Sequence, residues 1–409
     1  MTEKLYQQNV YLKSCDAVVT GIRDGRASFD RTVFFPEGGG QSSDVGTITL
    51  AGGETLPVTL VREENGGIWH RFQDGSGSGA ALSEGARVHL EIDWDHRFEN
   101  MQRHAGEHIL SGAFYRLFGG ANKGFHMGEE SMTIDIALPE DSPHKKISWS
   151  MAMDAERDAN RVIWRDEPIT VDYFARREEA EAMPLRKALA FDEDISIVTV
   201  GPKDHPSDCV ACCGTHPSSS GQVGLIKIYK VESNKGMTRV FFEAGSRALA
   251  RAESDYDMLY DLSLRLSTGT DDVLEKYDIQ QNRNRELHDE LNRLKKAQAG
   301  SEASSILESE TYGLIRRYSG GTIDDLLDIS KRLNGKLSTL VVLVHEPTHT
   351  CLLLSPGTKN GGDPSLHCGD LVKSLAKEAG GKGGGSDHSA RAIFPDSGSM
   401  EQFLKSLQV

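Results

Sequence analysis

Four residues in two segments that lie far apart in the chain place the strongest constraint on its fold. His104 and His108 are four residues apart in a segment whose apolar residues recur at helical spacing, so both imidazoles lie on one helix face, one turn apart. Cys212 and His216 belong to the segment CCGTH, a tight glycine turn that carries a thiolate and an imidazole. Three imidazoles and one thiolate are a tetrahedral donor set suited to zinc. We therefore expect the fold to join the helix and the turn around one Zn²⁺ per chain.

A structural metal site built from the second segment alone is one alternative. Cys209, Cys212 and Cys213 crowd into five residues, and His216 follows closely. Spacings of this kind are typical of metal-ligating clips. This arrangement would leave the histidine pair of the helix without a role.

A zinc peptidase is a second alternative, because residues 104–108 also match H-x-x-E-H. In that motif the glutamate, here Glu107, activates the attacking water. A peptidase of this class needs a distal carboxylate ligand, which the acidic run 178–181 would supply. It has no use for Cys212 and His216. If the protein is not a peptidase, Glu107 is either a general base or a solvent-facing helix residue.

Length and composition predict a multidomain globular protein. A chain of 409 residues is too long for one ordinary core, so two or three domains are expected, and 38% hydrophobic with 26% charged residues is a globular composition. No stretch approaches the roughly 18 apolar residues of a membrane span, so no membrane partner is expected. The first residues, MTEK, lack the apolar stretch of a secretory signal, and a cytoplasmic location follows.

The charge balance excludes a generally basic nucleic-acid binder. The formal net charge is −15, whereas phosphate contacts need concentrated lysine and arginine. Any RNA contact must therefore come from local charge, and the candidates are Arg283, Arg285, Arg293, Lys295, Lys296 and Lys382. Six cysteines are too few for a disulfide scaffold in a chain of this length.

Hydrophobic patterning predicts an α+β protein that begins with a small antiparallel β-barrel or sandwich over residues 1–92, and the barrel is the expected form. Short alternating runs separated by glycine and polar turns indicate antiparallel strands. The clearest runs are 17–20, 47–50, 58–61 and 88–92. The Gly/Ser-rich stretch 74–79 is expected to form a loop tip.

Residues 93–245 are predicted to form an α+β core that contains the zinc site. A helix begins at Asp93 or Asp95, which can cap it, and ends at Gly119-Gly120. Further helices are expected near 147–165 and 175–190. Strands are expected near 131–137, 168–174, 194–200, 223–230 and 238–243.

The remaining chain is predicted to form a helical arm or hairpin at 246–300 and a small α/β domain at 301–409. Leucine stripes such as Leu287, Leu291 and Leu294 predict pairing of two copies through the arm. Residues 301–320 are expected to be a polar connection. The glycine-rich stretch 380–385 is expected to end a helix at 363–379.

Together, these motifs resemble the editing domain of alanyl-tRNA synthetase and its free-standing AlaX-type relatives in the long form. The H-x-x-x-H helix paired with C-x-G-T-H carries the resemblance. The segments FFPEGGGQ at 34–41, DWDHR at 93–97 and the glycines at 380–385 also agree, the last resembling the C-terminal domain attached to DHH-type phosphoesterases. Class II aminoacylation motifs are missing upstream, which indicates an editing protein and not a synthetase. No D-H-H signature precedes the last domain, which disfavours a phosphoesterase.

The resemblance implies roles for particular residues. It favours Cys212 as the thiolate ligand, although Cys213 stands where relatives often have glycine and Cys209 is extra. Gly38, Gly39 and Gly40 would let backbone amides approach the substrate. Gln41 is a candidate for substrate contact, and Lys382 is a candidate for binding the RNA through its charge. Thr32 is the candidate for recognising a serine hydroxyl. Glu107 lies where relatives usually carry a neutral residue, which argues against an essential base.

By resemblance, the reaction is hydrolysis of the ester that joins a wrong amino acid to alanine tRNA. Serine is the expected error, because an alanine pocket rejects one added hydroxyl poorly and a second hydrolytic sieve is needed, and glycine is a second expected substrate. Zinc would activate water or orient the substrate; four protein ligands make a closed site, so the sequence leaves both roles open. The non-enzymatic alternative is a zinc-stabilised module that only binds tRNA.

Overall fold

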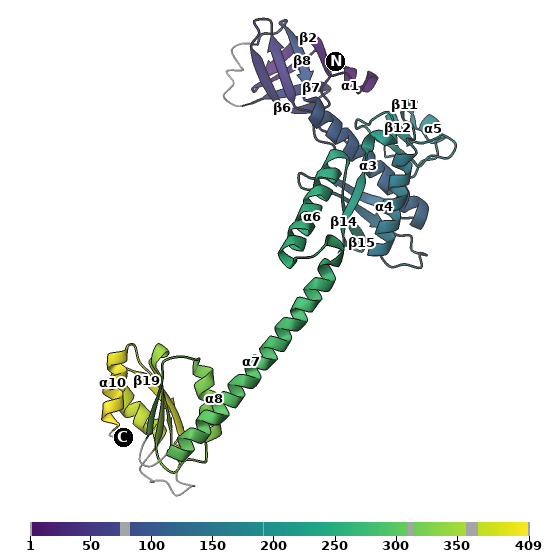
Figure 1. The fold of residues 1–409 in the computed structure, drawn as a ribbon. Coiled ribbons are helices and arrows are strands. Elements are labelled where there is room, and N and C mark those ends of the chain that lie inside the picture. The colour runs from purple at the N-terminus through teal and green to yellow at the C-terminus, as the bar shows by residue number, and fades with distance from the viewer. Residues whose placement is uncertain (1, 74–81, 191, 310–313, 357–366, 408–409) are drawn as a thin grey trace. The chain divides into compact units, whose positions relative to one another are not determined.

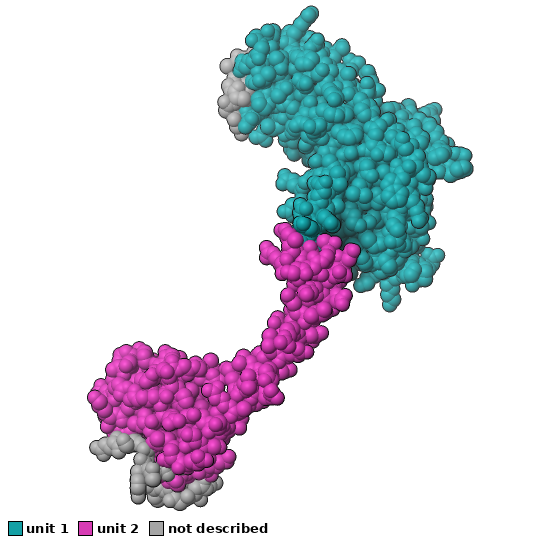
Figure 2. All heavy atoms as spheres, in the orientation of Figure 1, with its two compact units in different colours: residues 1–260 teal, residues 261–409 magenta. Residues whose placement is uncertain are grey.

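The computed structural model describes residues 2–73, 82–190, 192–309, 314–356 and 367–407, so the loop predicted at 74–79 lies outside the described residues. The chain forms two compact units, residues 1–260 and 261–409, coloured separately in Figure 2. The architecture is α+β, as predicted (Figure 1). No helix in the described ranges is long and apolar enough to cross a membrane.

The N-terminal part of the first unit is a closed six-stranded β-barrel, which confirms the barrel predicted from the alternating runs. In barrel order the strands are β2 (Ser14–Arg23), β3 (Arg26–Phe29), β7 (Gly67–Phe72), β6 (Thr55–Glu64), β5 (Gly46–Leu50) and β8 (Arg87–Ile92). In β8 the side chains of Val88, Leu90 and Ile92 point inward and alternate with exposed residues. Beside the barrel, β1 (Glu3–Lys4) pairs with β4 (Arg31–Thr32), and α1 (Leu5–Gln8) follows β1.

A buried ion pair fixes the glycine-rich segment of the barrel against the first long helix, α3 (Trp94–Phe118). Arg97 is fully buried and donates from Nε to Asp44 Oδ1 over 2.8 Å. The same guanidinium donates to the carbonyls of Val10 and Val33, and Asp44 Oδ2 accepts from the Phe35 amide over 2.6 Å. Because every one of these groups is satisfied, the desolvation cost of burying them is offset. The segment between strands β4 and β5 is thereby held over the helix that carries the histidine pair.

Helix α3 begins and ends where the sequence predicts. Asp93 caps it by accepting from the His96 amide over 3.1 Å, and Gly119 ends it in the left-handed conformation. One face packs on β15 (Met237–Ala244) so closely that a Cβ added at Gly106 would lie 2.4 Å from the Ala244 Cβ. Five buried apolar residues of α3 belong to one core of the first unit: Ala105, Ile109, Leu110, Ala113 and Phe114.

Two small sheets complete this core. The order of the four-stranded sheet is β14 (Ile226–Asn234), β15, β10 (Met132–Ala137) and β9 (Ala121–Met127). The three-stranded sheet consists of β11 (Ile169–Arg176), β12 (Glu193–Val200) and β13 (Asp208–Ala211). Helix α4 (Trp149–Trp164) packs beside α3 and β14, and a 3-10 turn, η1 (Ser220–Val223), precedes β14.

The helix predicted at 175–190 is wrong. In this range only the single turn α5 (Arg177–Ala180) forms, and residues 181–190 have no regular structure. Pro184 lacks an amide proton and disfavours helical backbone at the residue before it. This irregular segment carries Arg186 and Lys187 toward the site described below.

The helical region is longer than predicted. Helix α6 (Gly245–Leu266) is followed by the 3-10 turn η2 (Thr270–Asp272) and by α7 (Val273–Ser309). The expected polar connection after 300 is wrong over 301–309, because Ala303 and Ile306 are buried against α8 (Ile323–Leu333) and β17 (Val341–His345). Packing of these apolar side chains keeps the last turns of α7 helical.

The C-terminal domain is an α/β unit around a five-stranded sheet, ordered β16 (Leu314–Tyr318), β17, β18 (Thr350–Leu354), β20 (Ser389–Ile393) and β19 (Lys382–Gly385). The described helices around it are α8, η3 (Glu346–Thr348), α9 (Cys368–Leu371), η5 (Val372–Ala376) and α10 (Ser397–Ser406). The predicted helix at 363–379 is described only from 368 onward. Gly380 follows it, but the glycine stretch continues as strand β19, which pairs with β20. Lys382 is exposed at the start of this edge strand.

Candidate metal centre

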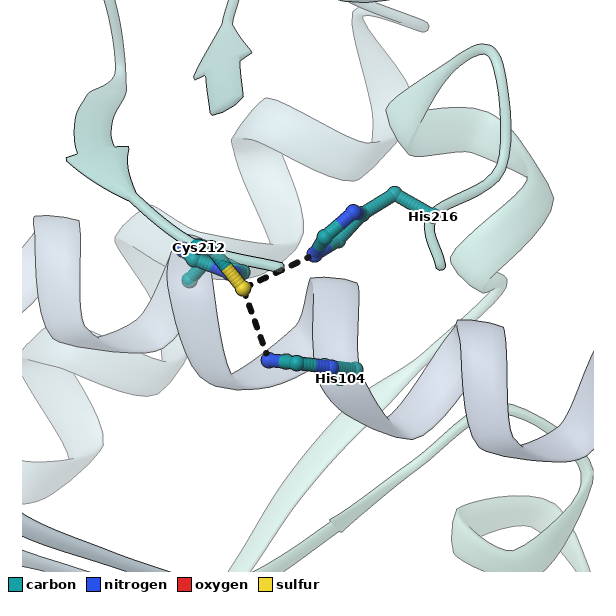
Figure 3. Close-up of side chains that lie close together, drawn as sticks. His104, Cys212 and His216 are labelled. Atoms are coloured by element: carbon teal, nitrogen blue, oxygen red, sulfur yellow. Dashed lines mark hydrogen bonds between the residues drawn. The ribbon is translucent and has the colours of Figure 1, made fainter. Parts of the chain in front are cut away.

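The structure brings the four predicted ligands together. His104 and His108 come from α3, and Cys212 and His216 come from the turn that follows β13. One ligand atom from each residue lies within 4.8 Å of the others. The Cys212 Sγ lies 3.3 Å from His104 Nε2 and 3.7 Å from His216 Nε2, and Figure 3 shows both imidazoles directed at the sulfur. The chemistry and spacing of these donors fit one zinc ion.

Gly214 allows the turn to approach the helix this closely. A Cβ built on Gly214 would lie 2.2 Å from His104 Cε1 and 2.3 Å from His104 Nδ1. The Gly214 amide also points at the Cys212 sulfur, at 3.4 Å, a contact that stabilises a thiolate. The glycine in C-x-G-T-H is therefore required by the contact between the two halves of the site.

Gln41 orients His104. Its side-chain oxygen accepts from His104 Nδ1 over 2.9 Å and from the Thr215 amide over 3.0 Å, while its Nε2 donates to the Thr215 hydroxyl over 2.8 Å. These bonds leave Nε2 of His104 facing the sulfur, the arrangement in which metal-binding histidines are usually held. The Gln41 side chain is buried and engaged in three hydrogen bonds, and its predicted contact with substrate stays a prediction.

His108 is oriented by an acidic residue that the sequence did not single out. Its Nδ1 lies 3.2 Å from Asp208 Oδ2, and Arg186 donates to the same carboxylate over 2.5 and 3.2 Å. Asp208 and Arg186 escaped prediction because one precedes the cysteine cluster as an ordinary strand residue and the other lies in the segment mistaken for a helix. Within the described residues, the buried atom His108 Nε2 has no hydrogen-bond partner, which also fits a site built for a metal.

The electrostatics of the cluster favour a thiolate. Burial alone would raise the pKa of Cys212, but the imidazoles of His104, His108 and His216 outweigh it and hold that pKa well below its usual value. Burial would likewise lower the pKa of His108, yet the adjacent Cys212 and Asp208 raise it to about 10. Burial lowers the pKa of His216 to about 4. A deprotonated sulfur beside imidazoles is the ligand form that zinc requires.

The other two cysteines of the segment lie elsewhere. Cys209 is buried in a separate small core, with its sulfur 3.6 Å from the Thr199 hydroxyl. Cys213 is exposed and faces the glycine-rich segment, where a Cβ on Gly39 would lie 2.9 Å from its sulfur. Neither belongs to the metal-ligating group of the described residues, so the local four-ligand alternative is not assembled. The acidic run 178–181 does not belong to this group either.

A cavity of about 220 Å³ opens beside the cluster. Its lining includes His104, His108, Cys212, Gly39, Glu107, Asn122, Lys123, Phe125, Arg186 and Lys187. Glu107 is buried, with 5% of its surface exposed, and accepts from the hydroxyl of Ser111 and the amide of Asn122. The interpretation of Glu107 as a solvent-facing helix residue is therefore wrong.

The other predicted residues are placed as follows. Gly39 lines the cavity, Gly39 and Gly40 both have positive φ, and a Cβ on Gly40 would lie 2.9 Å from Cδ1 of Phe125. Gly38 makes a tight bridge to Gln41. Lys382 lies in the other compact unit.

Thr32 lies inside the barrel. It is fully buried, it accepts from the Phe34 amide, and its hydroxyl is 2.9 Å from His70 Nε2. The His70 Nδ1 contacts the Ala27 carbonyl, so His70 Nε2 is the acceptor and the Thr32 hydroxyl donates to it. Thr32 is not among the residues that line the cavity, and its role in serine recognition stays a prediction.

Comparisons with known proteins match nearly the whole chain. It is 29% identical over 404 residues to the "Alanyl-tRNA editing protein AlaX-L" of Pyrococcus horikoshii, covering 96% of this chain and 94% of that protein. It is 29% identical to the "Alanine--tRNA ligase" of Pyrococcus abyssi over 99% of this chain, and 28% identical to that of Thermococcus kodakarensis over 100% of this chain. In both cases the match covers 43% of the ligase. Two family descriptions match, "Threonyl and Alanyl tRNA synthetase second additional domain" at residues 195–241 and "tRNA synthetases class II (A)" at residues 5–96.

Proposed function

From the premise that the chain is a relative of the alanyl-tRNA editing protein AlaX-L, as its motifs predicted, we propose that it is a zinc-dependent hydrolase that deacylates mischarged alanine tRNA in trans. The observation that carries the proposal is the cluster of His104, His108, Cys212 and His216 beside an open cavity. Serine is the expected wrong amino acid, with glycine as a second substrate, because these are the errors that an alanine pocket rejects poorly.

The four clustered residues would hold the zinc, and their neighbours would keep them in place. When bound, zinc would supply a Lewis acid that polarises the ester carbonyl and lowers the pKa of a water. Gln41 and Asp208 fix the ring orientations of His104 and His108, which keeps the donor atoms convergent.

The glycine-rich segment supports binding of the ester end of the substrate. Gly39 lines the cavity, and within the described residues the Gly39 amide has no hydrogen-bond partner. An amide in this position is suited to donate to the oxyanion that develops during ester hydrolysis. The backbone reaches the cavity here because glycine adds no side chain between the amide and the ligand.

Deacylation assays test the proposal directly. We expect the zinc-loaded protein to hydrolyse serine-charged alanine tRNA at least about tenfold faster than alanine-charged tRNA, the scale of discrimination that one added hydroxyl requires of a second sieve. Chelation of the metal should abolish this turnover. Rates are measured as release of labelled amino acid from each tRNA, and equal rates with and without metal would refute zinc dependence.

The same assay separates the alternatives. A non-catalytic tRNA-binding module would bind the charged tRNA without shortening the lifetime of its ester. A peptidase of the H-x-x-E-H type would cleave peptide substrates and would retain its metal after Cys212→Ala. The position of Cys212 within the cluster argues against the peptidase, because that class does not use a thiolate ligand.

We further propose that two copies pair through α7. Leu287, Leu291 and Leu294 form a stripe at i, i+4 and i+7, and each has half or more of its surface exposed. Such a stripe is the seam of a two-stranded coiled coil. Light scattering is expected to give the mass of a dimer for the full chain and of a monomer for Leu291→Glu. The control Arg285→Glu, outside the stripe, should stay dimeric, and an unchanged mass for Leu291→Glu would exclude this interface.

A further inference from the structure

The cavity beside the metal cluster is lined by charged residues of opposite sign. Lys123 and Lys187 line it and are exposed, whereas Glu107 lines it and is buried. Arg186, which also lines it, is already paired with Asp208. The lining therefore combines exposed cations with one buried carboxylate, which complements a ligand that carries both phosphates and a cation.

Glu107 is held in a fixed position by neutral groups. Its Oε1 accepts from the Ser111 hydroxyl over 2.6 Å and from the Asn122 amide over 2.7 Å, and Asn122 also donates to Ser111 over 3.0 Å. Two donors on one oxygen set the rotation of the carboxylate. The side chain is thus organised before any ligand arrives.

The second oxygen of Glu107 has no strong partner in the described part of the chain. Oε2 lies 4.0 Å from His108 Nδ1, which is already engaged by Asp208. No lysine or arginine of the described residues forms an ion pair with Glu107. A buried carboxylate is costly unless a cation pairs with it. The open position at Oε2 therefore favours a cation supplied by the ligand.

We propose that Glu107 binds the α-ammonium group of the amino acid to be removed, an inference that rests on the proposed function. In an aminoacyl ester the ammonium is one carbon from the carbonyl that is attacked, and Glu107 is adjacent to His108 in the same helix turn. Pairing with Glu107 positions the ester beside the metal cluster. It also selects esters of free amino acids over esters whose amino group is acylated, because acylation removes the charge and adds bulk.

The test compares two substrates on the zinc-loaded, full-length protein. Serine-charged alanine tRNA carries the ammonium, and the same tRNA charged with N-acetylserine lacks it. We expect Glu107→Gln to raise KM for the serine ester at least about tenfold, the scale of one hydrogen bond to a charged group, and to leave KM for the N-acetylserine ester unchanged. Glu107→Asp, which keeps the charge, should restore part of the loss. The exposed Glu178→Gln serves as the matched control and should behave as the wild type.

The outcomes distinguish failure of the proposed function from failure of the Glu107 assignment. If the wild type hydrolyses neither ester, the proposed function fails. If it hydrolyses both and Glu107→Gln lowers kcat equally on each, Glu107 is a general base and the ammonium assignment is overturned. Metal content is measured on every variant. If Glu107→Gln loses its metal, the same two substrates are compared on Asn122→Ala. This variant removes a hydrogen bond that holds the Glu107 carboxylate and alters none of the four clustered residues. An equal effect on both substrates would again overturn the assignment.

Discussion

Replacing Cys212 with alanine is expected to reduce bound zinc from about one per chain to almost none and to lower the deacylation rate more than about 100-fold. The sulfur of Cys212 lies between His104 and His216 and is the only thiolate in the ligating group of the described residues. Without it, three imidazoles remain, and the soft anionic ligand that favours zinc is lost. Metal content by atomic emission and single-turnover deacylation provide the two measurements.

Cys213 provides the matched control, because it is the adjacent residue and its sulfur is outside the cluster. Cys213→Ala should keep its zinc and its rate within about twofold of the wild type, the range of an ordinary surface substitution. Cys209→Ala removes a buried sulfur that packs in another core and should affect stability more than metal content. If Cys213→Ala loses zinc while Cys212→Ala keeps it, the assignment of the thiolate is reversed.

Sequence patterning was sufficient for the parts of the fold that depend on local signals. Helix α3 has a capping aspartate, a regular apolar repeat and a terminating glycine, and it begins and ends where these signals predict. The helix places His104 and His108 one turn apart by geometry alone. Cys212 and His216 are only four residues apart, so a tight turn is enough to bring both side chains to one ion. The cluster could therefore be predicted as two local pairs.

Long-range contacts were beyond the sequence. Nothing in the local pattern indicates that Gln41 bonds to His104 and Thr215, because these residues are brought together by the barrel, the helix and the turn. The ion pair of Asp208 and Arg186 could not be predicted either, because Arg186 lies in an irregular segment for which the local sequence favours a helix. The residues that orient the ligands were missed for this reason, while the ligands themselves were found.

The burial of Glu107 also could not be predicted from local sequence. On the helix it neighbours His108, and a single glutamate in a polar segment is ordinarily solvated. Strand β9 was not among the predicted elements, and it is β9 that carries Asn122 to the carboxylate and Phe125 to the cavity. Whether a polar helix residue faces solvent or a cavity depends on which strand packs beside it.

Gly214→Ala is expected to disrupt the metal centre although it changes no ligand. The added Cβ would lie 2.2 Å from His104 Cε1, far inside van der Waals contact, so the turn and the imidazole must separate. Because Gly214 does not have positive φ, the backbone itself tolerates alanine, and the effect comes from this collision. Loss of convergence should weaken zinc affinity about 10- to 100-fold or more, the range seen when supporting groups of a metal site are changed.

Competition with a chelator of known affinity measures this effect. The control is Gly52→Ala, an exposed turn position where a Cβ meets nothing within 4 Å and φ is not positive; its zinc affinity should equal that of the wild type. The helical circular dichroism of Gly214→Ala should also be unchanged, because α3 is anchored by buried apolar residues such as Ile109 and Ala113 and not by the metal. Wild-type affinity in Gly214→Ala would mean that the turn and the helix do not approach as closely as described, and the four residues would then not act as one site.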